Sequence, residues 1–234
     1  MNSESVKKDL QKLSDPKKAK ILSRFFKTGK GQYGEGDIFL GIPVPNQRRV
    51  AKRYVNLPLN ELEKLLNSKI HEHRLTALLI LVDKYKKTRL DSARQEIFDF
   101  YLKNTKNINN WDLVDLSAPN IVGNFLLNSN RNVLYKLANS KNLWEKRIAV
   151  LATYAFIKNN QFEDTLKISQ ILLKDKHDLM HKAVGWMLRE VGKRNQEIEE
   201  EFLKKYYKQM PRAMLRYAIE KFSEEKRRFY LKKK

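Results

Sequence analysis

Apolar and polar positions follow one another along this chain with the period of an α-helix, and no sustained period-two alternation predicts a strand. A basic residue followed by small and apolar residues begins four such segments, at Arg74, Arg147, Lys182 and Arg212. Another apolar segment, at residues 111–115, divides the longest interval between them. The pattern predicts about five units of roughly 30–37 residues, the length of a two-helix HEAT-like repeat.

The way such units bury their apolar faces predicts the fold. One two-helix unit cannot bury its apolar face alone, so neighbouring units must stack into an α-solenoid. We expect an all-α protein in which HEAT-like helical repeats over residues 1–234 form a single domain, a curved α-solenoid with a basic concave face. Ordinary helical-bundle spacing is the alternative explanation. Polar turns between the helices are expected at residues 104–110, 128–132, 139–142 and 158–160.

An early glycine-rich segment interrupts the helical pattern. Five of the eight glycines lie within residues 29–41, just ahead of Pro43 and Pro45. The segment lacks the G-x-x-x-x-G-K-[ST] order of a phosphate-binding loop and follows a predicted helix rather than a strand, which argues against nucleotide binding. Two interpretations stay open: a turn-rich connection to the solenoid, and a loop that contacts DNA.

The charge of the chain indicates a polyanionic partner. Lys and Arg number 48 against 27 Asp and Glu, which gives a net charge of +21. This exceeds the magnitude of roughly 2–8 that keeps a small domain soluble, although solubility alone is the competing explanation. Nucleic acid is the expected partner, because cations set against phosphates release counterions. A membrane partner is not expected, since the longest apolar stretch, residues 75–82, is far too short to span a bilayer.

The absence of cysteine removes several classes of chemistry. With no cysteine in the sequence, disulfides, thiolate metal sites and cysteine nucleophiles are excluded. His177 and His181 have the i, i+4 spacing of metal ligands but no third ligand nearby in sequence, so neither a metal nor another cofactor is expected. The first residues lack an apolar signal region, and we expect a cytoplasmic protein, nucleoid-associated in a prokaryote.

Five residues form the most informative pattern in the sequence. Trp111 and Asp115 are four apart, and Trp186 and Arg189 are three apart, so each pair shares a helix face. With Arg147, they are expected to direct two indoles, one carboxylate and two guanidiniums at a single surface. The competing interpretation of both tryptophans is ordinary core packing.

Two further assignments concern neighbours of these residues. Asp112 is the rival carboxylate, but it points about 100° away from Trp111 and suits the first turn of a helix. His71 and His73 stand beside Arg74 and are expected to line a basic surface.

The motifs that contain these residues resemble those of the AlkD-like DNA alkylation-repair glycosylases. The resemblance is carried by W-D-x-V-D at 111–115 and K-A-x-G-W-x-L-R-E at 182–190, with further similarity at 25–45 and 144–147. It implies a HEAT-like solenoid that holds duplex DNA and removes N3- or N7-alkylated purines without flipping the base into a pocket. A monofunctional, monomeric DNA glycosylase of base excision repair is the expected function.

The resemblance also implies roles for individual residues. By this resemblance, Asp115 is the expected catalytic carboxylate. Trp111 and Trp186 are the side chains expected to pack against the deoxyribose. Arg147 and Arg189 become phosphate ligands. Some family members carry Tyr in the first helix, where this chain has Phe25 and Phe26, and Phe25 is the expected aromatic contact with DNA. Further phosphate contacts are expected at Arg48, Arg49, Lys193 and Arg194.

One carboxylate suffices for this chemistry because of the charge of the substrate. Sugar glycosidases use one carboxylic acid to protonate the leaving group and a second carboxylate as base or nucleophile. An N7-alkylguanine already carries a positive charge and leaves without protonation. Two alternatives stay open: a non-enzymatic HEAT-like DNA-binding protein for damaged or branched DNA, and a scaffold for acidic protein partners.

Overall fold

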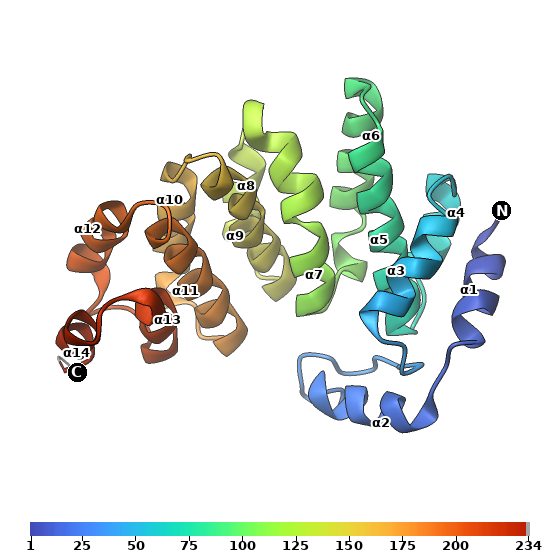
Figure 1. Ribbon diagram of the computed structural model, residues 1–234, viewed down its shortest axis with the longest axis horizontal. Helices are drawn as coiled ribbons and strands as arrows, with labels where there is room; N and C mark the ends of the chain where they lie inside the picture. Colours follow the sequence, from blue (N-terminus) through green and yellow to red (C-terminus); the bar gives the residue numbers. More distant parts are fainter. Residues whose placement is uncertain (233–234) are drawn as a thin grey trace. The chain divides into compact units, whose positions relative to one another are not determined.

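The computed structural model describes residues 1–232, in which loops and turns connect a series of helices (Figure 1). These residues contain no β-strand, and a single parallel bridge joins Ile38 to Ile70. The predicted all-α class is confirmed. The chain divides into two compact units, Met1–Ile121 and Val122–Lys234, which we call unit 1 and unit 2. The expectation of a single domain over the whole sequence stays a prediction.

Unit 1 contains seven α-helices within its described residues. Their bounds are α1 (Ser3–Gln11), α2 (Pro16–Phe25), α3 (Val44–Arg53), α4 (Leu59–Leu66), α5 (His71–Lys87), α6 (Asp91–Lys103) and α7 (Trp111–Ser117). A 3₁₀ turn, Thr105–Asn107, precedes α7, and a π-helical turn, Pro119–Gly123, follows it and contains the boundary between the units.

Unit 2 contains the other seven α-helices of the described chain. Their bounds are α8 (Asn132–Ala138), α9 (Leu143–Lys158), α10 (Glu163–Ile171), α11 (Asp178–Gly192), α12 (Gln196–Tyr206), α13 (Arg212–Ala218) and α14 (Glu224–Lys232). Short 3₁₀ turns occupy Leu126–Asn128, Leu172–Lys174 and Ile219–Lys221. The four predicted polar turns all fall between helices or at helix ends.

Each unit has the packing of a helical-repeat protein. In unit 1, α5 packs against α3 and α7, so alternate helices form one row, and α4 and α6 pair with α5. In unit 2, α11 packs against α9 and α13 in the same way, with α8, α10 and α12 as the paired helices. The central helices α5 and α9 carry the long apolar runs and are buried on nearly all sides, as helices inside a packed layer must be.

The glycine-rich segment is a tightly held connection between α2 and α3. The Glu72 carboxylate, in the first turn of α5, accepts hydrogen bonds from the backbone N–H groups of Leu40, Gly41 and Ile42 at 2.9, 2.8 and 3.2 Å. Gly41 has φ +86°, and a Cβ there would lie 2.1 Å from the carbonyl oxygen of Asp15. Only glycine fits this position. The segment therefore acts as a structural connection, and the other interpretation left open, a loop that contacts DNA, is untested.

No helix among residues 1–232 combines the length and apolar character needed to cross a membrane.

The close packing of α11 on α13 gives a test of the fold of unit 2. Glycine inside a helix ordinarily destabilises it by about 1 kcal/mol relative to alanine. At Gly185, however, an added Cβ would lie 2.4 Å from the Met214 carbonyl oxygen and 2.6 Å from Tyr217 Cβ. We therefore expect Gly185→Ala to lower the free energy of unfolding by about 1–3 kcal/mol. Denaturant unfolding measures this, with Ser92→Ala on the exposed side of α6 as the control. A variant as stable as the wild type would contradict the packing.

Candidate active site

The start of α7 places the two predicted residues of unit 1 on one helix. Asn110 caps the helix: its side-chain oxygen accepts the Trp111 N–H at 2.8 Å. Trp111 is the first residue of α7, and Asp115 follows one turn later. Both side chains are half-buried. The shared helix face predicted for this pair is therefore confirmed, and Trp111 is not a fully buried core residue.

Aromatic side chains from the N-terminal segment support the Trp111 indole. Phe26 stacks on it with ring centroids 5.2 Å apart and planes 16° apart, and Phe25 meets it edge-on at 6.0 Å. Phe26 is buried and stacks in turn on Phe39, whereas Phe25 is 61% exposed. Phe25, the expected aromatic contact with DNA, thus lies beside Trp111, and its ring is exposed to solvent.

Asp112, the rival carboxylate, is buried in a charged network. Its Oδ2 accepts a hydrogen bond from His71 Nε2 at 2.8 Å, and its Oδ1 accepts the N–H of Leu113 at 2.9 Å. The other ring nitrogen of His71, Nδ1, lies 3.1 Å from Asp37 Oδ2. Asp37 also pairs with Arg74 at 2.7 Å. Asp112 thus has a structural role in holding α7 to α5.

This network corrects the expectation that His71 and His73 line a basic surface. Both histidines are buried, and His71 is only 2% exposed. His73 Nδ1 bonds with the Ser68 hydroxyl at 2.9 Å, and burial lowers the pKa of His73 to about 4. No local pattern in the sequence predicts the burial of His71, because its partners Asp37 and Asp112 lie 34 and 41 residues away.

The geometry of the network makes His71 a cation. Ionised carboxylates only accept hydrogen bonds, so both ring nitrogens of His71 must donate. Burial by itself lowers the pKa of His71, but the adjacent charge and hydrogen bond of Asp112, with the hydrogen bond to Asp37, raise it to about 9. Burial has the opposite effect on Asp37 and by itself raises the pKa of that carboxyl, yet His71 and Arg74 together bring it below its ordinary value.

In unit 2, most of the Arg147 side chain is used inside the fold. Arg147 is 5% exposed, and its Nη1 donates to the Leu179 carbonyl oxygen at 2.7 Å. The bond ties α9 to the first turn of α11. The phosphate contact expected at Arg147 stays a prediction.

Trp186, Arg189 and Lys193 converge on one carboxylate that the sequence argument missed. Glu190 Oε1 accepts from Trp186 Nε1 at 3.1 Å and lies 3.4 Å from Arg189 Nη2 and 2.7 Å from Lys193 Nζ. Arg189 also forms an ion pair with Glu220. Asp115 is therefore not the only acidic side chain beside a predicted tryptophan or arginine. The i, i+4 spacing of Trp186 and Glu190 was the available signal.

The remaining predicted cations lie on exposed surface. Arg48 and Arg49 are exposed on α3, and Lys193 and Arg194 are exposed at the end of α11. Helix α2 has no buried residue and adds exposed Lys17, Lys18, Lys20 and Arg24. On the same helix Ile21 is 65% exposed, an apolar position beside Phe25 that the sequence analysis did not single out.

The five residues of the predicted constellation fall in two groups. Trp111 and Asp115 belong to unit 1, and Arg147, Trp186 and Arg189 belong to unit 2. Within each unit they lie on the helices of the repeat row, α7 in one and α9 and α11 in the other. A single common surface for all five stays a prediction.

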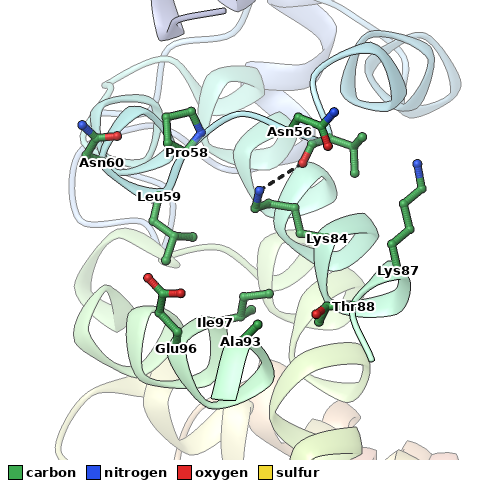
Figure 2. A pocket seen from close by; sticks show the side chains of 11 residues that line it. Asn56, Pro58, Leu59, Asn60, Lys84, Lys87, Thr88, Ala93, Glu96 and Ile97 are labelled. Atoms are coloured by element: carbon green, nitrogen blue, oxygen red, sulfur yellow. Dashed lines mark hydrogen bonds between the residues drawn. The ribbon is translucent and has the colours of Figure 1, made fainter. Parts of the chain in front are cut away.

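A cavity in unit 1 is separate from these residues. It has a volume of about 630 Å³ and lies among the connection before α4, the end of α5 and α6. Lys84 Nζ donates a hydrogen bond to the Val55 carbonyl oxygen at 3.2 Å, and the dashed line in Figure 2 marks this bond. None of the predicted site residues lines this cavity.

No group of three or more potential metal ligands occurs among residues 1–232. At the pair considered for a metal, His177 Nδ1 accepts the Leu179 N–H at 3.1 Å and His181 Nε2 donates to the Asp175 carbonyl oxygen at 2.6 Å. Both histidines thus stabilise the start of α11.

The comparison with protein families shows the family to which the chain belongs. The family model described as DNA alkylation repair enzyme matches residues 6–222, which include every predicted site residue. This chain belongs to the DNA alkylation repair enzyme family. Its membership supports an enzyme with a role in DNA repair.

A solved structure supports the fold of this family member. A predicted DNA alkylation repair enzyme from Enterococcus faecalis is similar to the chain with a TM-score of 0.70 and 18% sequence identity. The similarity covers 90% of this chain and 97% of the other. No curated protein matches the sequence.

The charge of His71 makes the stability of this alkylation-repair protein depend on pH. Its pKa is raised from 6.5 in the unfolded chain to about 9 in the folded protein. The folded state therefore holds the proton more tightly, and the stabilisation is complete below about pH 6.5 and is lost as the pH rises through about 9. The loss is on the order of 3 kcal/mol.

Urea unfolding at several pH values between about 6 and 10 measures this slope. His71→Gln should flatten it, and His73→Gln, which alters a buried histidine hydrogen-bonded to the Ser68 hydroxyl, should leave it in place. A wild-type slope that survives in His71→Gln would contradict the assignment.

Proposed function

We propose that this protein is a monofunctional DNA glycosylase that hydrolyses the N-glycosidic bond of cationic N3- or N7-alkylated purines in duplex DNA. N7-methylguanine and N3-methyladenine are the proposed substrates. The base leaves without being flipped into a pocket, and the protein acts as a monomer on cytoplasmic or nucleoid DNA. Membership of the DNA alkylation repair enzyme family supports the repair role.

One observation carries the proposal: the two carboxylates of the W-D-x-V-D motif have different environments. Asp112 is buried and bound to the His71 imidazolium at 2.8 Å. Asp115 is half-buried, on the helix face that also carries Trp111. We therefore assign the chemical role to Asp115 and the structural role to Asp112.

The chemistry follows from the charge of the leaving group. As the C1′–N bond breaks, its electron pair returns to the cationic purine, which departs as a neutral base. The sugar acquires oxocarbenium character, which a fixed carboxylate stabilises electrostatically. Water then adds to C1′, and its proton passes to Asp115 or to solvent. The products are the free base and an abasic site, and no second carboxylic acid is needed.

The indole of Trp111 supplies a wall for the sugar. A cationic sugar is attracted to the electron-rich face of an aromatic ring. Stacking on Phe26 holds the indole in a fixed orientation. In unit 2, Glu190 fixes the indole N–H of Trp186 at 3.1 Å, and we assign the same role to that ring.

The exposed cations supply the affinity for DNA. Arg48, Arg49, Lys193 and Arg194 all lie on exposed surface and are proposed as phosphate ligands. Arg189, paired with Glu190 and Glu220, contributes to the same phosphate contacts by exchanging a carboxylate for a phosphate oxygen.

Removal of the Asp115 charge tests the assignment of the catalytic group. We expect Asp115→Asn to reduce single-turnover release of N7-methylguanine by about 10² or more, because loss of a preorganised charge typically removes several kcal/mol of transition-state stabilisation. Folding and DNA affinity should stay close to the wild type. Asp99→Asn, on the exposed side of α6, is the matched control and should retain full activity. Retained excision in Asp115→Asn would exclude this role for the carboxylate.

The dependence of binding on salt tests the phosphate contacts. The logarithm of the binding constant should fall with the logarithm of salt concentration, with a slope of about 0.9 per neutralised phosphate. Joint replacement of Arg48 and Arg49 by Ala should reduce the magnitude of this slope by about 2. Lys167→Ala, which removes a cation paired with Glu163 at 2.6 Å on α10, is the control. An unchanged slope in the double variant would remove α3 from the interface.

A protein that binds DNA without excision is the second candidate. It would show the salt dependence but release no base from any alkylated duplex.

A further inference from the structure

His71 joins three segments of unit 1 that are distant in sequence. It is the first residue of α5, and it binds Asp37 in the glycine-rich connection at 3.1 Å and Asp112 in the first turn of α7 at 2.8 Å. Asp37 also accepts from Asn110, the cap of α7, at 3.2 Å. Two separate hydrogen bonds therefore tie the start of α7 to this network.

The charged groups of the network balance one another. His71 and Arg74 are the cations and Asp37 and Asp112 are the anions, and all four side chains are no more than 8% exposed. Removal of one buried charge leaves its partner uncompensated, which is strongly destabilising. A neutral imidazole has one N–H, so deprotonated His71 can donate to Asp37 or to Asp112, but not to both.

Aromatic contacts connect the same histidine to the proposed sugar wall. The His71 ring stacks on Phe39 at 4.6 Å and lies 5.1 Å from Phe26. Phe26 stacks on Trp111 at 5.2 Å. His71 is therefore connected to Trp111 both through these rings and through Asp112, the sequence neighbour of Trp111.

We propose that His71, as an imidazolium that bridges Asp37 and Asp112, is the positioning residue that orients Trp111 and Asp115 for base excision. The inference rests on the proposed glycosylase function. His71 is buried and does not touch the DNA; it acts by fixing the rotation of α7. Small displacements of a reacting group of about 1 Å slow enzymatic reactions by as much as about 10². Its pKa of about 9 keeps the bridge protonated at neutral pH.

The first experiment follows Trp111 without measuring activity. The chain has three tryptophans, so ¹H–¹⁵N spectra contain three indole signals, and the Trp111 signal is identified as the one lost in Trp111→Phe. We expect this signal to shift as the pH rises through about 9, and the shift to be absent in His71→Gln. In His73→Gln the shift should be retained. A Trp111 signal that does not respond to pH in the wild type would overturn the inference.

The second experiment measures excision and binding separately. Single-turnover release of N7-methylguanine by His71→Gln should be slower than the wild type by about tenfold or more at about pH 7.5, with DNA affinity changed less than about twofold. Asp112→Asn, which removes the other side of the bridge, should show the same pattern. Circular dichroism confirms that each variant is folded, and His73→Gln should excise at the wild-type rate.

The pH dependence of excision distinguishes a positioning role of His71 from a merely structural one. The ratio of wild-type to His71→Gln excision rates cancels titration of the substrate, and it should decrease toward one as the pH rises above about 9. A ratio that is constant with pH would contradict the inference. A wild-type protein that releases no base would refute the proposed function and, with it, the role of His71 in excision. The pH response of the Trp111 signal would still decide whether His71 orients the indole.

Discussion

The contact between the His71 imidazolium and the Asp112 carboxylate is the interaction on which the arrangement of unit 1 depends. It joins the first residue of α5 to the first turn of α7, 41 residues later. Buried ions lose the hydration they have in water, so such a contact is stable only when further charges and hydrogen bonds compensate for that loss. Asp37, Arg74 and Asn110 supply this compensation. The glycine-rich segment is thereby explained, because it carries Asp37 to this position while Glu72 binds its backbone.

The same principle separates structural from exposed charges across the chain. Asp112 and Arg147 are buried and make bonds that hold one helix to another, whereas Arg48, Arg49, Lys193 and Arg194 face solvent. A net charge of +21 therefore describes mainly the surface, where it is available to a polyanion. The proposed mechanism uses this division: exposed cations hold the DNA, and a carboxylate on a fixed helix acts on the sugar.

The parts of this structure that depend on local sequence could be predicted, and the parts that depend on distant partners could not. Helical periodicity and polar turns predicted the all-α class and the ends of α6, α8 and α9, and the four-residue spacing placed Trp111 and Asp115 on one helix. The burial of His71 depends on Asp37 and Asp112, and that of Arg147 depends on a carbonyl oxygen 32 residues away. No window of a single helix contains those partners. Glu190 is a different case. Its position four residues after Trp186 could be read from the sequence, but its contacts with Trp186, Arg189 and Lys193 were not predicted.

The proposed mechanism needs only one carboxylate because the leaving base is already cationic. It is tested most directly by comparing free-base release from matched duplexes that contain N7-methylguanine or uracil. A neutral base needs a proton in the transition state, and general acid catalysis typically contributes 10²–10⁴-fold. With a single carboxylate, we expect N7-methylguanine to be released faster than uracil by at least about 10². Comparable rates on the two duplexes would mean that a general acid takes part, and would contradict the single-carboxylate mechanism.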